Sequence, residues 1–162
     1  MAVVNISGDA RGTVASVSNG LAQTPRVCRK HFTVGATDSA TSTYYVGRVP
    51  SRGRPLMSSR IAWDDLASSG SPTLDIGLFA VNSNVTDDVD ALNDGLDAAT
   101  VSTVGGVPVI KDPNANSSKM FWEYVSGVTS DPGGDLDIKI SLLDADVNVG
   151  GDLNIEIYYT ID

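Results

Sequence analysis

Several residue types on which catalytic sites depend are nearly absent from this chain of 162 residues. It contains one cysteine and one histidine, Cys28 and His31, so an intrachain disulfide is excluded. A Ser-His-Asp or Cys-His system needs an imidazole beside its nucleophile. In a strand, residues 28 and 31 point to opposite faces, so this pair does not converge. We therefore predict no catalytic residues, and we expect that the protein is not an enzyme.

The ligands of a metal or cofactor site are also few or badly spaced. A closed structural zinc site takes four ligands, commonly Cys and His, and this chain has one of each. The acidic stretch 87–97 suggests calcium, but an EF-hand loop counted from Asp88 or Asp90 puts Leu92 at a ligand position. A solvated acidic segment is the simpler interpretation, and an irregular calcium site there stays open. No Walker A or G-x-G-x-x-G pattern is present, so no metal and no cofactor are predicted.

Long apolar runs and abundant aromatic residues are lacking as well. No apolar run approaches the roughly 20 residues of a membrane span, and residues 1–5 lack the basic and apolar regions of a secretory signal. Aromatic residues make up 6% of the chain. Trp63 and Trp122 lie in strand-like runs beside large apolar residues, which indicates core positions. A carbohydrate-binding adhesion module, which would need exposed aromatic side chains, is kept as an alternative function.

What the sequence has instead is a succession of β patterns separated by turn signals. Residues 136–142 and 153–161 alternate apolar and polar, the period of a strand with one dry and one wet face. Residues 73–81 are apolar on both faces, which is typical of a central strand. Further strands are expected at residues 31–34, 43–46, 59–63, 101–110 and 120–125. This spacing predicts an all-β fold, a single β-sandwich or jelly roll.

One segment has a helical spacing instead. Val89, Leu92 and Leu96 recur at i, i+3 and i+7, and Thr86 precedes them as a candidate N-cap. We therefore expect one short helix within residues 87–99, in a connection between strands.

The first 30 residues differ from the rest in composition. They are rich in Gly, Ser, Ala and Thr and show no sustained period. Such a segment is typical of an extended N-terminal arm that becomes ordered against a partner. The predicted organisation is an arm at residues 1–30 and one β-sandwich domain at residues 31–162.

Charge is divided unevenly along the chain, which has a net charge of −9. Residues 1–60 carry eight basic side chains against two acidic ones, and residues 61–162 carry three against 18. Arginine suits bidentate contacts with carboxylates. The candidate interface residues are the seven arginines of the first part: Arg11, Arg26, Arg29, Arg48, Arg52, Arg54 and Arg60. They either pair with the chain's own acids or face an acidic partner. Nucleic acid is not an expected partner, because the overall negative field opposes a polyanion.

Four segments in the middle of the chain carry a resemblance to a known group of proteins. They are YYVGRVP (44–50), SRIAWDDL (59–66), TLDIGLFAV (73–81) and DVDAL (88–92). A strand ending near a proline is followed by a second strand, a strand of the form apolar-Asp-apolar-Gly-apolar, and an acidic loop. Over residues 42–100 this pattern resembles small structural proteins encoded in the head-gene regions of tailed bacteriophages.

The resemblance implies a jelly-roll or sandwich subunit on the virion, most simply a capsid decoration (cement) protein. The implied partners are the major capsid protein and further copies of this chain, commonly as a homotrimer where capsomers meet. The implied location is the capsid surface, after synthesis in the host cytoplasm, with no membrane involved. No functional residues carry over, because no shared catalytic or ligand motif exists to match. Another virion component, such as a head fibre base or a tail or adaptor subunit, is the alternative.

Overall fold

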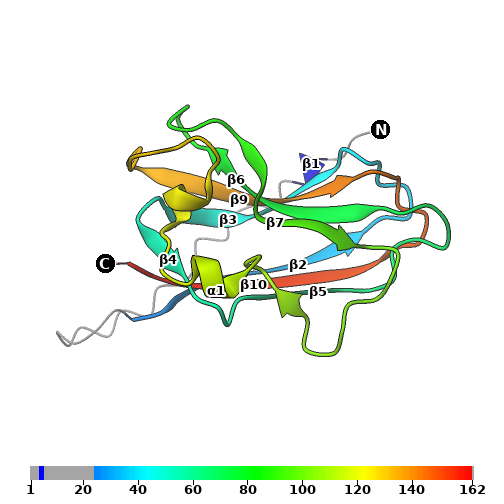
Figure 1. Ribbon diagram of the computed structural model, residues 1–162. Coiled ribbons are helices and arrows are strands. Elements are labelled where there is room, and N and C mark those ends of the chain that lie inside the picture. Colours follow the sequence, from blue (N-terminus) through cyan, green and yellow to red (C-terminus); the bar gives the residue numbers. More distant parts are fainter. Residues whose placement is uncertain (1–3, 6–23, 162) are drawn as a thin grey trace.

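The alternating segments of the sequence form the two layers of a β-sandwich (Figure 1). A computed structural model describes residues 4–5 and 24–161. Sheet A has the strand order β1-β3-β9-β6-β7, and sheet B has the order β2-β10-β5-β8, with β4 also paired to β10. The pairs are antiparallel except β1 with β3, which is parallel. The predicted all-β sandwich is therefore confirmed.

The strands of sheet A are β1 (Val4–Asn5), β3 (Thr43–Pro50), β6 (Thr73–Ala80), β7 (Asp88–Asp97) and β9 (Asp135–Leu143). Those of sheet B are β2 (Arg26–Val34), β4 (Gly53–Pro55), β5 (Arg60–Trp63), β8 (Val107–Pro108) and β10 (Gly151–Ile161). Two short helical segments, α1 (Pro113–Asn116) and the 3₁₀ turn η1 (Phe121–Tyr124), lie between β8 and β9. None of the helices in the described residues has the length and apolar character needed to span a membrane.

The core lies between the inward faces of the two sheets. The longest strands supply it by alternation, so that every second residue along most of each strand is removed from water; Ser141 and Thr160 are buried as well. From β9 the buried side chains are Leu136, Ile138, Ile140 and Leu142, and from β10 they are Leu153, Ile155, Ile157 and Tyr159. The half-buried strands predicted at residues 136–142 and 153–161 are thus confirmed, and their polar positions form the outer faces.

The connection from β2 to β3 crosses from one sheet to the other and is held by a buried hydrogen bond. The Tyr44 hydroxyl donates to Asp38 Oδ2 at 2.6 Å, and the same oxygen accepts the backbone N–H of Gly35 at 3.2 Å. Burial, and then this bond to a carboxylate, raise the pKa of Tyr44 far above its ordinary value. The Tyr44 ring also packs on Phe32, with ring centroids 5.5 Å apart. These contacts tie the two sheets together at this edge.

The helix predicted at residues 87–99 is wrong, because this segment is the edge strand β7. Its pairing with β6 contains two register shifts. Ile76 pairs with Asn93 and Leu78 pairs with Asp88, so a step of two residues in β6 corresponds to a longer step in β7. The extra residues form bulges, and they give the apolar positions of β7 a spacing that resembles a helix. The short helix of this fold is α1 instead.

The strand predicted at residues 120–125 is also wrong, because the segment forms η1. The turn begins where the Met120 N–H donates to Glu123 Oε2 at 2.7 Å, and it places Phe121 in the core. The strand predicted at residues 101–110 is reduced to the two residues of β8. In both segments, local hydrogen bonds replace a regular ladder.

The first strand of sheet B starts five residues before the predicted domain boundary at residue 31. β2 begins at Arg26 and pairs with β10 along its whole length. The three consecutive polar residues Arg29, Lys30 and His31 break the apolar–polar alternation and concealed this strand, in which only Cys28 among residues 26–30 is buried. Residues 1–3 and 6–23 lie outside the described part of the chain, and the arm expected there stays a prediction.

One glycine is required by close packing and allows a test of the inter-sheet contact. Gly47 lies at a register shift in β3, where an added Cβ would stand 2.3 Å from Cys28 Sγ. We expect Gly47→Ala to lower the free energy of unfolding by about 1–3 kcal/mol in urea denaturation. In a Cys28→Ala background the same substitution should cost much less, because the sulfur is gone. An equal loss in both backgrounds would contradict this steric cause.

Candidate interaction surface

Three neighbouring strands of sheet B bring two arginines to either side of one carboxylate. On the outward face, Glu156 of β10 lies opposite Arg29 of β2 on one side and Arg60 of β5 on the other. Arg29 Nε lies 2.7 Å from Glu156 Oε1, and the Tyr158 hydroxyl donates to Glu156 Oε2 at 2.9 Å. Glu156 is therefore held in place, while the side chains of Arg29 and Arg60 remain exposed.

A hollow of about 320 Å³ opens beside this row, over β2 and β10. It is lined by Arg29, Lys30, His31, Asn154, Ile155 and Glu156. At its margin, His31 Nε2 lies 3.2 Å from Asp152 Oδ1, with both side chains more than half exposed. Arg29, His31 and Arg60 thus share this face with the carboxylates of Glu156 and Asp152.

The structure divides the seven predicted interface arginines among several places. Arg29 and Arg60 share the outer face of sheet B, and Arg54 of β4 takes an outward position beside Thr160 on the same sheet, where it is half-buried. Arg26 is exposed at the start of β2, on the core side of the strand's alternation. Arg11 lies outside the described residues.

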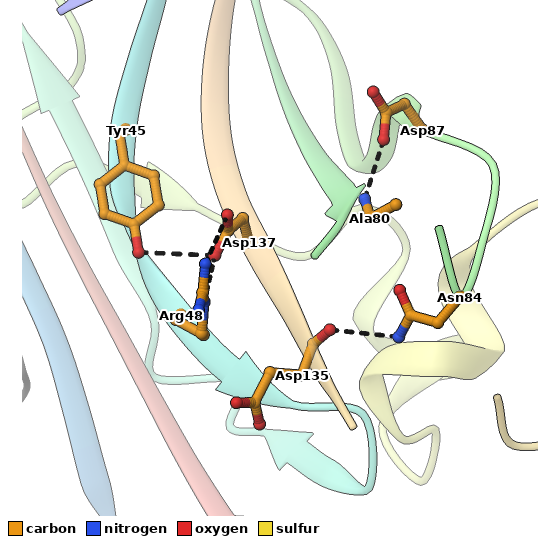
Figure 2. Close-up of polar contacts among 7 residues, drawn as sticks. All are labelled: Tyr45, Arg48, Ala80, Asn84, Asp87, Asp135 and Asp137. Carbon is orange, nitrogen blue, oxygen red and sulfur yellow. Dashed lines mark hydrogen bonds and ion pairs between the residues drawn. The ribbon is translucent and has the colours of Figure 1, made fainter. Parts of the chain in front are cut away.

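Arg48 lies on the other sheet and is bound within the chain. Its Nε and Nη2 donate to the two carboxylate oxygens of Asp137, at 2.7 and 3.2 Å, as Figure 2 shows. The Tyr45 hydroxyl points to the same carboxylate at 3.4 Å. The fork-to-fork geometry of Arg48 and Asp137 is the strong form of this ion pair. It raises the pKa of Arg48 and makes this arginine part of the outer face of sheet A.

Arg52 is bound to the chain's own acids as well. Its Nε contacts Asp131, whose carboxylate also accepts the Ser51 hydroxyl at 2.7 Å and the Gly133 N–H at 2.9 Å. Arg52 first, and then these two donors, hold the pKa of Asp131 below its ordinary value. Arg29, Arg48 and Arg52 thus each form an ion pair within the chain.

The residues considered for catalysis and metal binding are dispersed. Cys28 is buried in the core, where burial raises the pKa of its thiol, while His31 points outward, as the strand period predicts. The neighbouring carboxyl group of Asp88 raises the pKa of Asp90. Within residues 4–5 and 24–161, no three His, Cys, Asp or Glu side chains are grouped so as to hold a metal ion.

The two tryptophans do not form a common exposed platform. Trp63 is 6% exposed and its indole N–H donates to the carbonyls of Asp97 and Thr100, at 3.1 and 2.9 Å. Trp122 is half-buried in η1. The prediction that Trp63 is a core residue is confirmed, and a glycan-stacking role for it has no support in this geometry.

Comparisons with known proteins identify the fold. No protein-family model matches the chain, and no curated protein matches it. A chain of the structure described as the cyanophage Pam1 capsid asymmetric unit aligns with a TM-score of 0.56 and 13% identity, covering 97% of this chain and 99% of that one. A chain of the capsid of Ralstonia phage GP4 aligns with the same TM-score and 19% identity, covering 92% of both chains. This protein thus shares its fold, nearly end to end, with chains found in two phage capsids.

The cluster around Asp131 predicts a pH-dependent contribution to stability. A carboxyl whose folded pKa is depressed stabilises the fold above its unfolded pKa, and this contribution is lost as the pH falls through the folded pKa. We expect Asp131→Asn to cost about 1–2 kcal/mol at about pH 7 and little at about pH 2. Urea denaturation at both pH values measures this. The control Asp112→Asn, at an exposed residue whose side chain makes no helix cap, should show no such difference. A cost for Asp131→Asn that does not change with pH would refute the assignment.

Proposed function

We propose that this protein is a structural component of a tailed-bacteriophage virion, and specifically a decoration protein that binds the capsid shell. The observation that carries the proposal is the end-to-end alignment with chains of two phage capsid structures. Because almost all of each matched chain is covered, those chains have about the size of this one. A single sandwich of this size suits a subunit added to a shell.

The physical organisation of the chain supports such a role. A ligand that binds only the assembled shell stabilises that state by linkage, and many copies per particle multiply a modest affinity at each site. The two-sheet body buries its apolar side chains between the layers and keeps charged side chains on both outer faces. Such a body does not depend on the shell for its folding, so its outer faces and loops are available for contacts with the shell.

The most direct test is binding to purified heads that lack this protein. We expect saturable co-sedimentation with a fixed number of copies per particle, and we expect decorated heads to resist heating better than bare ones. Imaging of the particles locates the protein, and mass photometry of the free protein tests the proposed homotrimer. Binding to tails or fibres without binding to heads would replace the decoration role with that of another virion component.

Of the seven predicted interface arginines, those on the outer face of sheet B are our candidates for an acidic surface of the major capsid protein. Arg29 and Arg60 flank Glu156 and keep their side chains exposed, and Arg54 lies on the same face. Arg48 lies instead on sheet A, where it pairs with Asp137 as Arg29 pairs with Glu156 on sheet B. The proposal therefore places the contact on one face of the sandwich.

Paired neutralisations test this choice of face. We expect the double variant Arg29→Gln, Arg60→Gln to weaken binding to heads by about tenfold and to reduce the salt dependence of binding. The double variant Arg48→Gln, Arg52→Gln changes the net charge equally and should bind like the original protein. Thermal denaturation confirms that both variants are folded. Equal weakening by both double variants would show a general charge effect and remove the claim for sheet B.

A further inference from the structure

The loop that joins β7 to β8, residues 98–106 (the β7–β8 loop), exposes apolar side chains at its end. Figure 1 shows this segment, in yellow-green, extending beyond the sandwich on the side of sheet B. Val104 is 107% exposed and Val101 59% exposed. No charged residue occurs from 98 to 110, the longest uncharged run within residues 24–161. The loop is therefore an uncharged projection that exposes two valines on an acidic protein.

The base of the β7–β8 loop is fixed to the body through Trp63 of β5. The indole donates to the carbonyls of Asp97 and Thr100, as described above. The backbone N–H of Trp63 donates to the Ser102 hydroxyl, and the Ser102 N–H donates to the Trp63 carbonyl, both at 3.0 Å. Because Trp63 is buried, these bonds hold the loop to a rigid strand.

The end of the loop is a tight turn that fixes the position of Val104. The Gly106 N–H donates to the Thr103 carbonyl at 2.8 Å, and Gly105 and Gly106 have φ of 85° and 71°. A Cβ on Gly106 would lie 2.5 Å from the Ile61 carbonyl oxygen, so the turn is pressed against β5. The turn is thus closed by its backbone and its glycines, and the Val104 side chain adds no burial to the fold.

We propose that the β7–β8 loop is a preorganised docking element whose Val104 side chain inserts into an apolar socket of the capsid shell protein. This inference rests on the proposed function and names the chemistry of one contact. A rigid element loses little conformational entropy on binding. The centres of protein interfaces are depleted of charged residues, and the uncharged run around Val104 matches that composition.

The shell protein is a better occupant than a second copy of this chain. The exposed large apolar side chains of the described residues are Val89, Val101, Val104 and Val149, on three separate segments. The hollow over β2 and β10 is lined by charged and polar side chains together with Ile155. Such a surface offers a valine a poor match.

The test compares substitutions of Val104 in binding to purified heads that lack the protein. We expect Val104→Asp and Val104→Lys both to weaken binding by at least about tenfold, because neither charge can enter an apolar socket without losing its water. Val104→Ile should bind about as well as the original. All three should keep the original melting temperature, since the side chain is exposed. Val149→Asp, at a valine that is 36% exposed elsewhere, is the matched control and should bind normally.

The outcomes separate this inference from the proposed function. If the original protein binds heads and Val104→Asp and Val104→Lys bind equally well, the docking role of the loop is wrong while the decoration role stands. If Val104→Asp weakens binding and Val104→Lys strengthens it, the contact is electrostatic and the apolar socket is refuted. Dissociation of a free oligomer by Val104→Asp would assign the loop to a contact between copies. Failure of the original protein to bind heads would overturn both proposals.

Discussion

The register of β10 is the constraint on which the rest of the structure depends. This strand pairs with β2 on one side and with β4 and β5 on the other, so one alternation decides which face of sheet B is dry. Ile155 and Ile157 point inward, and Glu156 between them points outward. A shift of the register by one residue would bury the Glu156 carboxylate and expose the two isoleucines. Both changes would destabilise the fold, because a buried charge loses its hydration and the core loses apolar contacts. The positions of Arg29 and Arg60 on either side of Glu156 follow from this register.

The parts of the fold that the sequence predicts correctly are those in which the pattern is local. Residues 136–142 and 153–161 alternate without interruption, and each forms a half-buried strand. The pattern of β7 was misleading because its apolar spacing depends on bulges against β6, and the partner strand cannot be identified from the segment itself. η1 was missed for a related reason, since the Glu123 carboxylate binds the Met120 N–H and closes a turn within a strand-like sequence.

The candidate surface was predictable in its chemistry and not in its geometry. The arginines were grouped by their place in the chain, without regard to the face of the strand on which each lies. Successive residues of β2 point to opposite faces, so Arg29 points outward and Arg26 lies on the core side. This grouping also ignores ion pairs with carboxylates that are distant in sequence. Asp137, for example, pairs with Arg48, which is 89 residues away in the chain. The role of Trp63 shows the same limit: burial was predicted from its neighbours, but its two bonds to the carbonyls of Asp97 and Thr100 depend on tertiary structure.

The groups that we propose for partner binding are largely different from those that stabilise the fold. Ion pairs such as Arg48 with Asp137 lie within the chain, and a guanidinium already bound to a carboxylate gains less from a second one, because the first must be released or shared. The proposed contact through sheet B would supply orientation and long-range attraction, which weaken as salt screens them. A contact through Val104 is different, because the burial of apolar surface is not screened by salt. With both proposed contacts, the protein would stay on its partner in changing ionic conditions, because the charged face would select the approach and the rigid apolar loop would limit dissociation.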